Sequence, residues 1–138
     1  MTVILFRLFG LLLLVIELSG CAEPPYNNLD NDQLKAMLEQ GTPIYDICRP
    51  EEWHQTGVVA DSQLLTFVDD GGRVLPDFMH RSTSAVGKDD PVVLICRTGN
   101  RTSTLARHLV EQMGYTQVYN VRDGITRWIR DDRPVTRL

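Results

Sequence analysis

One cysteine of this chain stands between a predicted strand and a predicted helix. The unbroken apolar run at residues 91–95 predicts a strand buried on both faces of a parallel sheet, and Cys96 follows it directly. The spacing of apolar residues over 102–113 predicts a helix. In open α/β sheets, ligands bind at the carboxyl ends of the strands, so we expect Cys96 to face a ligand site.

The loop that follows Cys96 has the composition of an anion-binding loop. Its backbone N–H groups can converge on one anion, the next helix adds the positive end of its dipole, and two arginines add fixed charge. These effects favour thiolate over thiol, so we expect Cys96 to act as a nucleophile near neutral pH. The alternative is a structural cysteine beside a turn. The expected binding residues are Arg97, Thr98, Gly99, Asn100, Arg101 and Thr102.

The elements around this loop alternate between strand and helix. The expected order is a helix that starts at Asp30 or Asn31 and ends before Gly41, a strand over 43–48, a helical turn over 50–54, a strand over 64–68, a helix over 75–86, the strand over 91–95, the helix over 102–113, a strand over 118–121 and a helix over 124–130. This alternation with short links predicts an α/β sandwich around a mainly parallel sheet.

Composition narrows the class of protein. The 138 residues suffice for one domain, and a hydrophobic content of 43% allows a packed core. The net charge is −4 and no run of Lys and Arg forms a phosphate-binding stripe, so we expect no nucleic-acid partner. The five arginines between 122 and 137 alternate with aspartates, as on a solvated mixed-charge face. The three histidines, His54, His80 and His108, lack metal-ligand spacing, so no metal and no cofactor are expected.

The amino-terminal segment resembles a bacterial lipoprotein signal. The apolar run at residues 8–16 is too short to span a bilayer, which takes about 18 residues. It is followed by Leu18-Ser19-Gly20-Cys21, which is similar to a lipobox and implies lipidation at Cys21. We therefore expect a signal peptide over 1–20, a polar tether over 21–28 and one domain over 29–138, held on the bacterial cell envelope facing the periplasm. An ordinary cleaved signal or an uncleaved anchor are the alternatives.

Three motifs of the chain resemble those of the rhodanese family. The segment 96–101 is similar to its active-site loop, residues 44–59 resemble its first signature, and residues 120–128 resemble its closing Gly-Gly-Ile-x-x-Trp segment. The resemblance implies a rhodanese-like three-layer sandwich with helices on both faces of the sheet. It also implies that Cys96 takes a sulfane sulfur from thiosulfate or a persulfide donor and passes it to a thiol or cyanide acceptor. Arg97, Arg101 and the loop amides would hold the anionic donor.

The chain departs from the family pattern in its first signature. Cys48 occupies the place of an arginine, with Arg49 one position further on, so the usual ion pair from that arginine to Glu52 is open. Asp46 is expected to be a structural partner of the active-site loop. Cys48 is expected to be a small buried packing residue that forms no disulfide with Cys96.

Other functions remain as alternatives. Related phosphatases and arsenate reductases place five residues between cysteine and arginine, whereas four separate Cys96 from Arg101, which favours sulfur transfer. An intact loop does not distinguish a sulfurtransferase from a persulfide carrier or envelope binding module without turnover. A thiol-redox protein is the least favoured alternative.

Overall fold

The computed structural model describes residues 20–138, so the predicted signal peptide lies, except for its last residue, outside the described part of the chain. The strands are β1 (Asn27–Leu29), β2 (Ile44–Asp46), β3 (Gln63–Leu64), β4 (Val92–Ile95) and β5 (Val118–Val121). The helices are α2 (Asn31–Glu39), α3 (Pro50–Thr56), α4 (Phe78–Ala85), α5 (Asn100–Glu111) and α6 (Gly124–Arg130). Among these residues, no helix is both long and apolar enough to span a bilayer.

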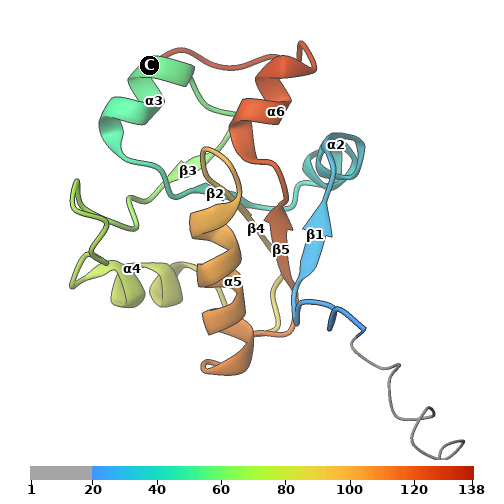
Figure 1. Ribbon diagram of the computed structural model, residues 1–138, viewed down its shortest axis with the longest axis vertical. Coiled ribbons are helices and arrows are strands. Elements are labelled where there is room, and N and C mark those ends of the chain that lie inside the picture. The colour runs from blue at the N-terminus through green and yellow to red at the C-terminus, as the bar shows by residue number, and fades with distance from the viewer. Residues whose placement is uncertain (1–19) are drawn as a thin grey trace, which may run out of the picture.

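The five strands form one parallel sheet in the order β1-β5-β4-β2-β3. Helices α4 and α5 cover one face of this sheet, and α2 and α6 cover the other (Figure 1). The predicted α/β sandwich with a mainly parallel sheet and helices on both faces is therefore confirmed. Strand β2 pairs with β4, so the segments that lead to Cys48 and Cys96 leave the sheet from neighbouring strands.

Two buried clusters hold the layers together. Phe78, Leu105 and Leu109 from α4 and α5 pack on one face of the sheet. Leu34 of α2 and Ile125 of α6 pack on the other face. All four residues of β4 are buried, which explains why its sequence is uniformly apolar instead of alternating. Both tryptophans are buried, as expected of core residues.

Local sequence explains how several elements begin. Asp30 caps α2, because its side chain accepts the N–H of Gln33 at 2.8 Å while the side chain of Gln33 accepts the N–H of Asp30 at 2.9 Å. Gly41 follows this helix with φ of +80°, in the left-handed region that favours glycine. Pro50 opens α3, where a missing N–H costs nothing.

The structure differs from the sequence prediction in the bounds of several elements. Helix α5 begins and ends two residues earlier than predicted, and the strand predicted over 43–48 is shortened to β2. The predicted strand over 64–68 is reduced to β3, although Leu65 and Phe67 still donate backbone hydrogen bonds to Asp46 and Ile47. The helix predicted over 75–86 begins only at Phe78. Strand β1 was not predicted, and it includes Asn27 and Asn28, which the sequence placed in the polar tether. This strand forms through pairing with β5 and not through a local apolar pattern.

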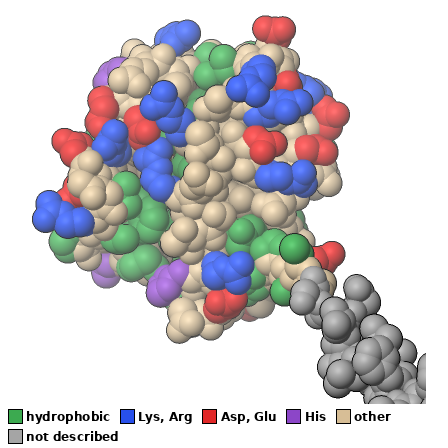
Figure 2. Space-filling view, in the orientation of Figure 1, with side chains coloured by type: hydrophobic (Ala, Val, Ile, Leu, Met, Phe, Trp, Pro, Cys, Tyr) green, Lys and Arg blue, Asp and Glu red, His purple; other side chains and the backbone are tan. Residues whose placement is uncertain are grey.

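The surface carries charges of both signs. Figure 2 shows basic and acidic side chains interspersed on one face of the molecule. Near the carboxyl end, Arg127 pairs with Asp131, and Arg133 pairs with Asp32 across the fold. Two of the five arginines predicted to lie on a mixed-charge face, Arg127 and Arg133, thus have acidic partners within the described residues.

Candidate functional site: a cysteine under an amide loop

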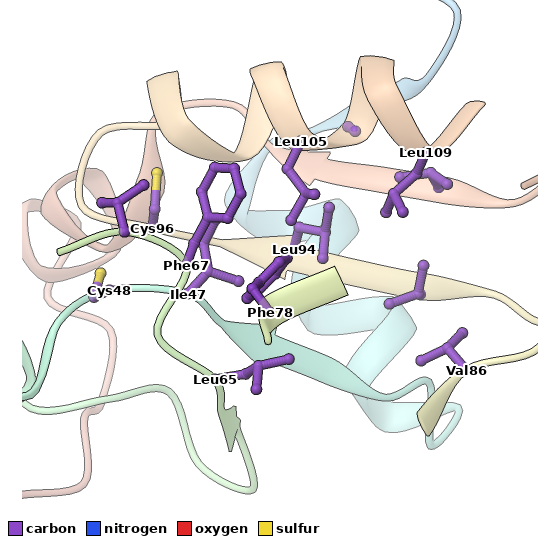
Figure 3. Close-up of a cluster of buried hydrophobic side chains, with 14 of the residues drawn as sticks. Ile47, Cys48, Leu65, Phe67, Phe78, Val86, Leu94, Cys96, Leu105 and Leu109 are labelled. Carbon is purple, nitrogen blue, oxygen red and sulfur yellow. The ribbon is translucent and has the colours of Figure 1, made fainter. Parts of the chain in front are cut away.

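Cys96 lies directly after β4, under the loop that leads into α5. Its residue surface is only 1% exposed, and its side chain belongs to the cluster on the α4 and α5 face of the sheet. Figure 3 shows its sulfur beside the first turn of α5, with Cys48 on the neighbouring segment. The strand-loop-helix placement predicted for Cys96 is therefore what the structure contains.

Two groups contact the sulfur of Cys96. The backbone N–H of Gly99 donates to Sγ at 3.2 Å, and Oγ1 of Thr102 lies 3.4 Å from it. The Thr102 hydroxyl also lies 3.1 Å from the carbonyl oxygen of Gly99 and is fully buried. A hydroxyl can donate to this carbonyl while it accepts the S–H of a thiol, or turn its hydrogen to a thiolate. Thr102 therefore contacts the sulfur of the predicted nucleophile directly.

The remaining amides of the loop are available to an anion. Within residues 20–138, no acceptor takes a hydrogen bond from the backbone N–H groups of Arg97, Thr98, Asn100, Arg101 and Thr102. The loop turns at Gly99, whose φ of +89° lies in the left-handed region. A Cβ at Gly99 would lie 1.9 Å from the carbonyl oxygen of Arg122, so only glycine fits here. Successive unpaired N–H groups in such a turn form an anion-binding concavity.

The guanidinium of Arg101 is held by Glu52 of α3. Both contacts of this two-pronged pair measure 2.8 Å, and the Glu52 side chain is 7% exposed. The hydrogen bonds to Glu52 raise the pKa of Arg101. Burial raises the pKa of Glu52, but the hydrogen bonds and charge of Arg101 and the N–H of Arg49 outweigh burial and hold it below its usual value. The pair anchors the end of the loop to α3.

Glu52 thus has an arginine partner, although position 48 is a cysteine. Its partner is Arg101, whereas the family pattern pairs it with an arginine at position 48. Arg49 remains near Glu52, with Nε 3.7 Å from Oε2, and pairs more closely with the exposed Glu51. Arg97, by contrast, is exposed.

Asp46 lies at the end of β2 and is 1% exposed. Its Oδ1 accepts the backbone N–H of Cys48 at 3.0 Å, which fixes the turn after the strand. Burial raises the pKa of Asp46. The expected support of the active-site loop by Asp46 is therefore indirect: it shapes the segment that leads to Glu52.

Cys48 is buried, as expected of a packing residue, and it is a free thiol in the structure. Burial and the neighbouring Asp46 carboxylate raise the pKa of Cys48. Cys21 is also a free thiol, and it is exposed.

Sequence reasoning missed one contributor to the site, the turn between β5 and α6. The N–H of Ile125 donates to the carbonyl oxygen of Cys96 at 2.9 Å, and the N–H of Thr126 donates to that of Arg97 at 3.1 Å. The closing motif at residues 120–128 was the available signal, but it does not reveal which segment it touches.

The chain is similar to known sulfurtransferases. It is 32% identical over 111 residues to a sulfurtransferase of Allochromatium vinosum, which covers 79% of this chain and 94% of that protein. It is 26% identical over 103 residues to thiosulfate sulfurtransferase GlpE of Pseudomonas fluorescens, which covers 75% of this chain and 84% of that protein.

Solved structures share the fold. A rhodanese-related protein of Thermoplasma volcanium aligns with a TM-score of 0.61 at 23% identity, over 80% of this chain and 98% of that one. The polysulfide-sulfur transferase homodimer of Wolinella succinogenes aligns with a TM-score of 0.64 at 18% identity, over 83% of this chain and 80% of that one. The relatives support a general sulfurtransferase role. Since the model of the Rhodanese-like domain matches residues 30–131, the chain belongs to the rhodanese-like family.

Proposed function

We propose that this chain transfers a sulfane sulfur through a persulfide on Cys96. The Cys96 thiolate attacks the outer sulfur of thiosulfate, the S–S bond of thiosulfate breaks, and sulfite leaves with the electron pair. A persulfide donor reacts in the same way and leaves as a thiolate. An acceptor thiolate or cyanide then attacks the outer sulfur, giving a new persulfide or thiocyanate, and the Cys96 thiolate is restored.

One observation carries this proposal: the sulfur of Cys96 lies under a loop whose unpaired N–H groups are available to an anion. Gly99 already donates to Sγ, and the five other N–H groups of residues 97–102 have no acceptor in the described structure. A persulfide carries its negative charge on the outer sulfur, one bond beyond Sγ. Preorganised N–H donors stabilise such a charge without reorganisation. The loop therefore favours the persulfide anion over a neutral adduct.

The size of the loop favours sulfur over a larger oxyanion. Arg101 closes the loop with four residues between it and Cys96, and Glu52 holds its guanidinium. A loop pinned in this way encloses a single atom beyond Sγ more readily than a tetrahedral phosphate. Hydrolysis of a phosphate ester is the competing outcome.

The test is mass spectrometry of the full chain after incubation with thiosulfate. We expect one added sulfur on the peptide that contains Cys96, loss of the adduct in Cys96→Ser, and retention in the control Cys48→Ser. An adduct that persists in Cys96→Ser would contradict the proposal, as would hydrolysis of a phosphate ester without any sulfur adduct. A thiosulfate:cyanide assay then separates enzyme from carrier, because only an enzyme forms thiocyanate over many turnovers.

We also propose that the chain is exported and lipid-anchored at Cys21, facing the periplasm. The lipobox-like Leu18-Ser19-Gly20-Cys21 and the apolar run before it support this proposal. A mature lipoprotein carries several acyl chains, each CH₂ contributing about 0.8 kcal/mol on burial, which gives firm attachment. In a bacterial host, labelled fatty acid should enter the wild-type chain and not Cys21→Ser. Wild-type protein that takes up no fatty acid would contradict lipidation.

A further inference from the structure

The turn that opens α6 lies in direct contact with the active-site loop. Gly124 has φ of +62°, and a Cβ at this position would lie 2.4 Å from the carbonyl oxygen of Arg97 and 2.5 Å from that of Cys96. Such distances are shorter than any tolerated contact between a carbon and a backbone oxygen. Only glycine therefore lets α6 approach the loop this closely.

This close approach forms two hydrogen bonds to the loop backbone. The N–H of Ile125 binds the carbonyl of Cys96, and the N–H of Thr126 binds the carbonyl of Arg97. Both are first-turn donors that have no acceptor within their own helix. The two bonds fix the orientation of two successive peptide planes in the loop.

Peptide planarity transmits this orientation to the side of the loop that faces the sulfur. In a trans peptide, the C=O and the N–H point in opposite directions. Because the carbonyls of Cys96 and Arg97 point to α6, the N–H groups of Arg97 and Thr98 point away from it. Ile125 packs on one face of the sheet, and the Cys96 side chain packs on the other. The two N–H groups are therefore directed to the face that holds the sulfur.

We propose that Gly124 is a positioning residue that aims the N–H groups of Arg97 and Thr98 at the anion on Cys96. The identification of this anion as a persulfide rests on the proposed function, but the aim of the two N–H groups does not. The preceding Asp123 has φ of −106° and needs no left-handed conformation. The constraint for glycine thus falls on position 124 alone within this turn.

The test compares Gly124→Ala with the matched control Gly114→Ala. Gly114 also has a left-handed φ, +75°, but nothing lies within 4 Å of its would-be Cβ. Gly114 follows the end of α5 that lies away from the loop. At a rise of about 1.5 Å per residue, the length of α5 separates Gly114 from the loop by about 18 Å. Both substitutions strain the backbone and leave the charge unchanged, and only one displaces the loop.

The readout is the ratio of the rates at which iodoacetate and iodoacetamide alkylate Cys96 in the full chain. The same thiolate attacks both reagents, so its population cancels, and the ratio reports how well the loop receives a negative charge. We expect Gly124→Ala to lower the ratio about tenfold, the effect of one lost hydrogen bond to an anion, while Gly114→Ala matches wild type. An unchanged ratio in folded Gly124→Ala would overturn the proposal, and so would a wild-type Cys96 that neither reagent modifies.

A second measurement needs no variant and covers the case in which Gly124→Ala does not fold. Carboxymethylation of Cys96 in the ¹⁵N-labelled wild type places a carboxylate in the loop. We expect the N–H proton resonances of Arg97 and Thr98 to move downfield as they donate to it. Resonances that stay in place would overturn the proposal. Neither measurement requires sulfur transfer, so failure of the proposed function would be seen separately, as a missing thiosulfate adduct.

Discussion

Replacing Glu52 with Gln should destabilise the protein and loosen the active-site loop. Glu52 receives three N–H donors, two from the guanidinium of Arg101 and one from the backbone of Arg49. Gln keeps the shape of the side chain, but one of its two terminal groups is itself a donor. That NH₂ group would face an N–H of Arg101 or Arg49 at a position with little access to water.

The size of the effect follows from burial. A hydrogen bond to a charged group contributes about 1.5–3 kcal/mol, and breaking a fully buried ion pair costs about 3–5 kcal/mol. The Arg101 side chain is 24% exposed and regains some hydration when it loses its partner. We therefore expect Glu52→Gln to lower the free energy of unfolding by about 2–3 kcal/mol. The matched control is Glu51, an exposed neighbour that pairs with Arg49. Glu51→Gln should lower the free energy of unfolding by at most about 1 kcal/mol.

Urea denaturation of wild type, Glu52→Gln, Glu51→Gln, Arg101→Ala and the double variant Glu52→Gln/Arg101→Ala measures these values. Once Arg101 is absent, Glu52→Gln should cost less than about 1 kcal/mol, because the partner is already lost. The pKa of Glu52 is lowered in the folded protein from its usual 4.5. The contribution of its carboxylate is therefore complete above about pH 4.5 and disappears as the pH falls through the folded-state pKa.

Two results would refute this reasoning. One is a Glu52→Gln variant that loses no more stability than Glu51→Gln. The other is a stability difference between wild type and Glu52→Gln that stays constant as the pH falls well below 4.5, since a carboxylate that is protonated in both states contributes no ion pair.

Two further predictions concern the nucleophile and its neighbour. Thr102→Val removes the buried hydroxyl beside Sγ but keeps the branched shape of the side chain, and it should slow alkylation of Cys96 about tenfold. The exposed Thr104→Val should not slow it, and equal rates in the two variants would contradict a role for the hydroxyl. Cys48→Ser should leave sulfur transfer largely intact, because burial raises the pKa of the Cys48 thiol and keeps it protonated, and mild oxidation of the wild type should give no Cys48–Cys96 bridge. A mapped Cys48–Cys96 disulfide would instead favour a thiol-redox role.

Much of the fold could be predicted because its signals are local. The apolar run of β4 and the helical pattern after it were sufficient to place Cys96 at a strand end, and α6 has its predicted bounds. The elements that prediction missed depend on remote partners. Strand β1 has only three residues and forms because it pairs with β5. The segment after β3 is buried, but it does not form the strand that its β-branched residues suggested.

The sequence by itself determined which residues are candidates for the chemistry: a cysteine, a glycine that permits the turn, and N–H groups made available by a helix start. All of these lie within a few residues of one another, so local patterns specify them. The tertiary structure decided how the loop is held. Glu52 lies 49 residues from Arg101, and Gly124 meets the loop from the opposite face of the sheet. Such contacts depend on strand order and on the direction of the side chains and carbonyls, which no short stretch of sequence encodes.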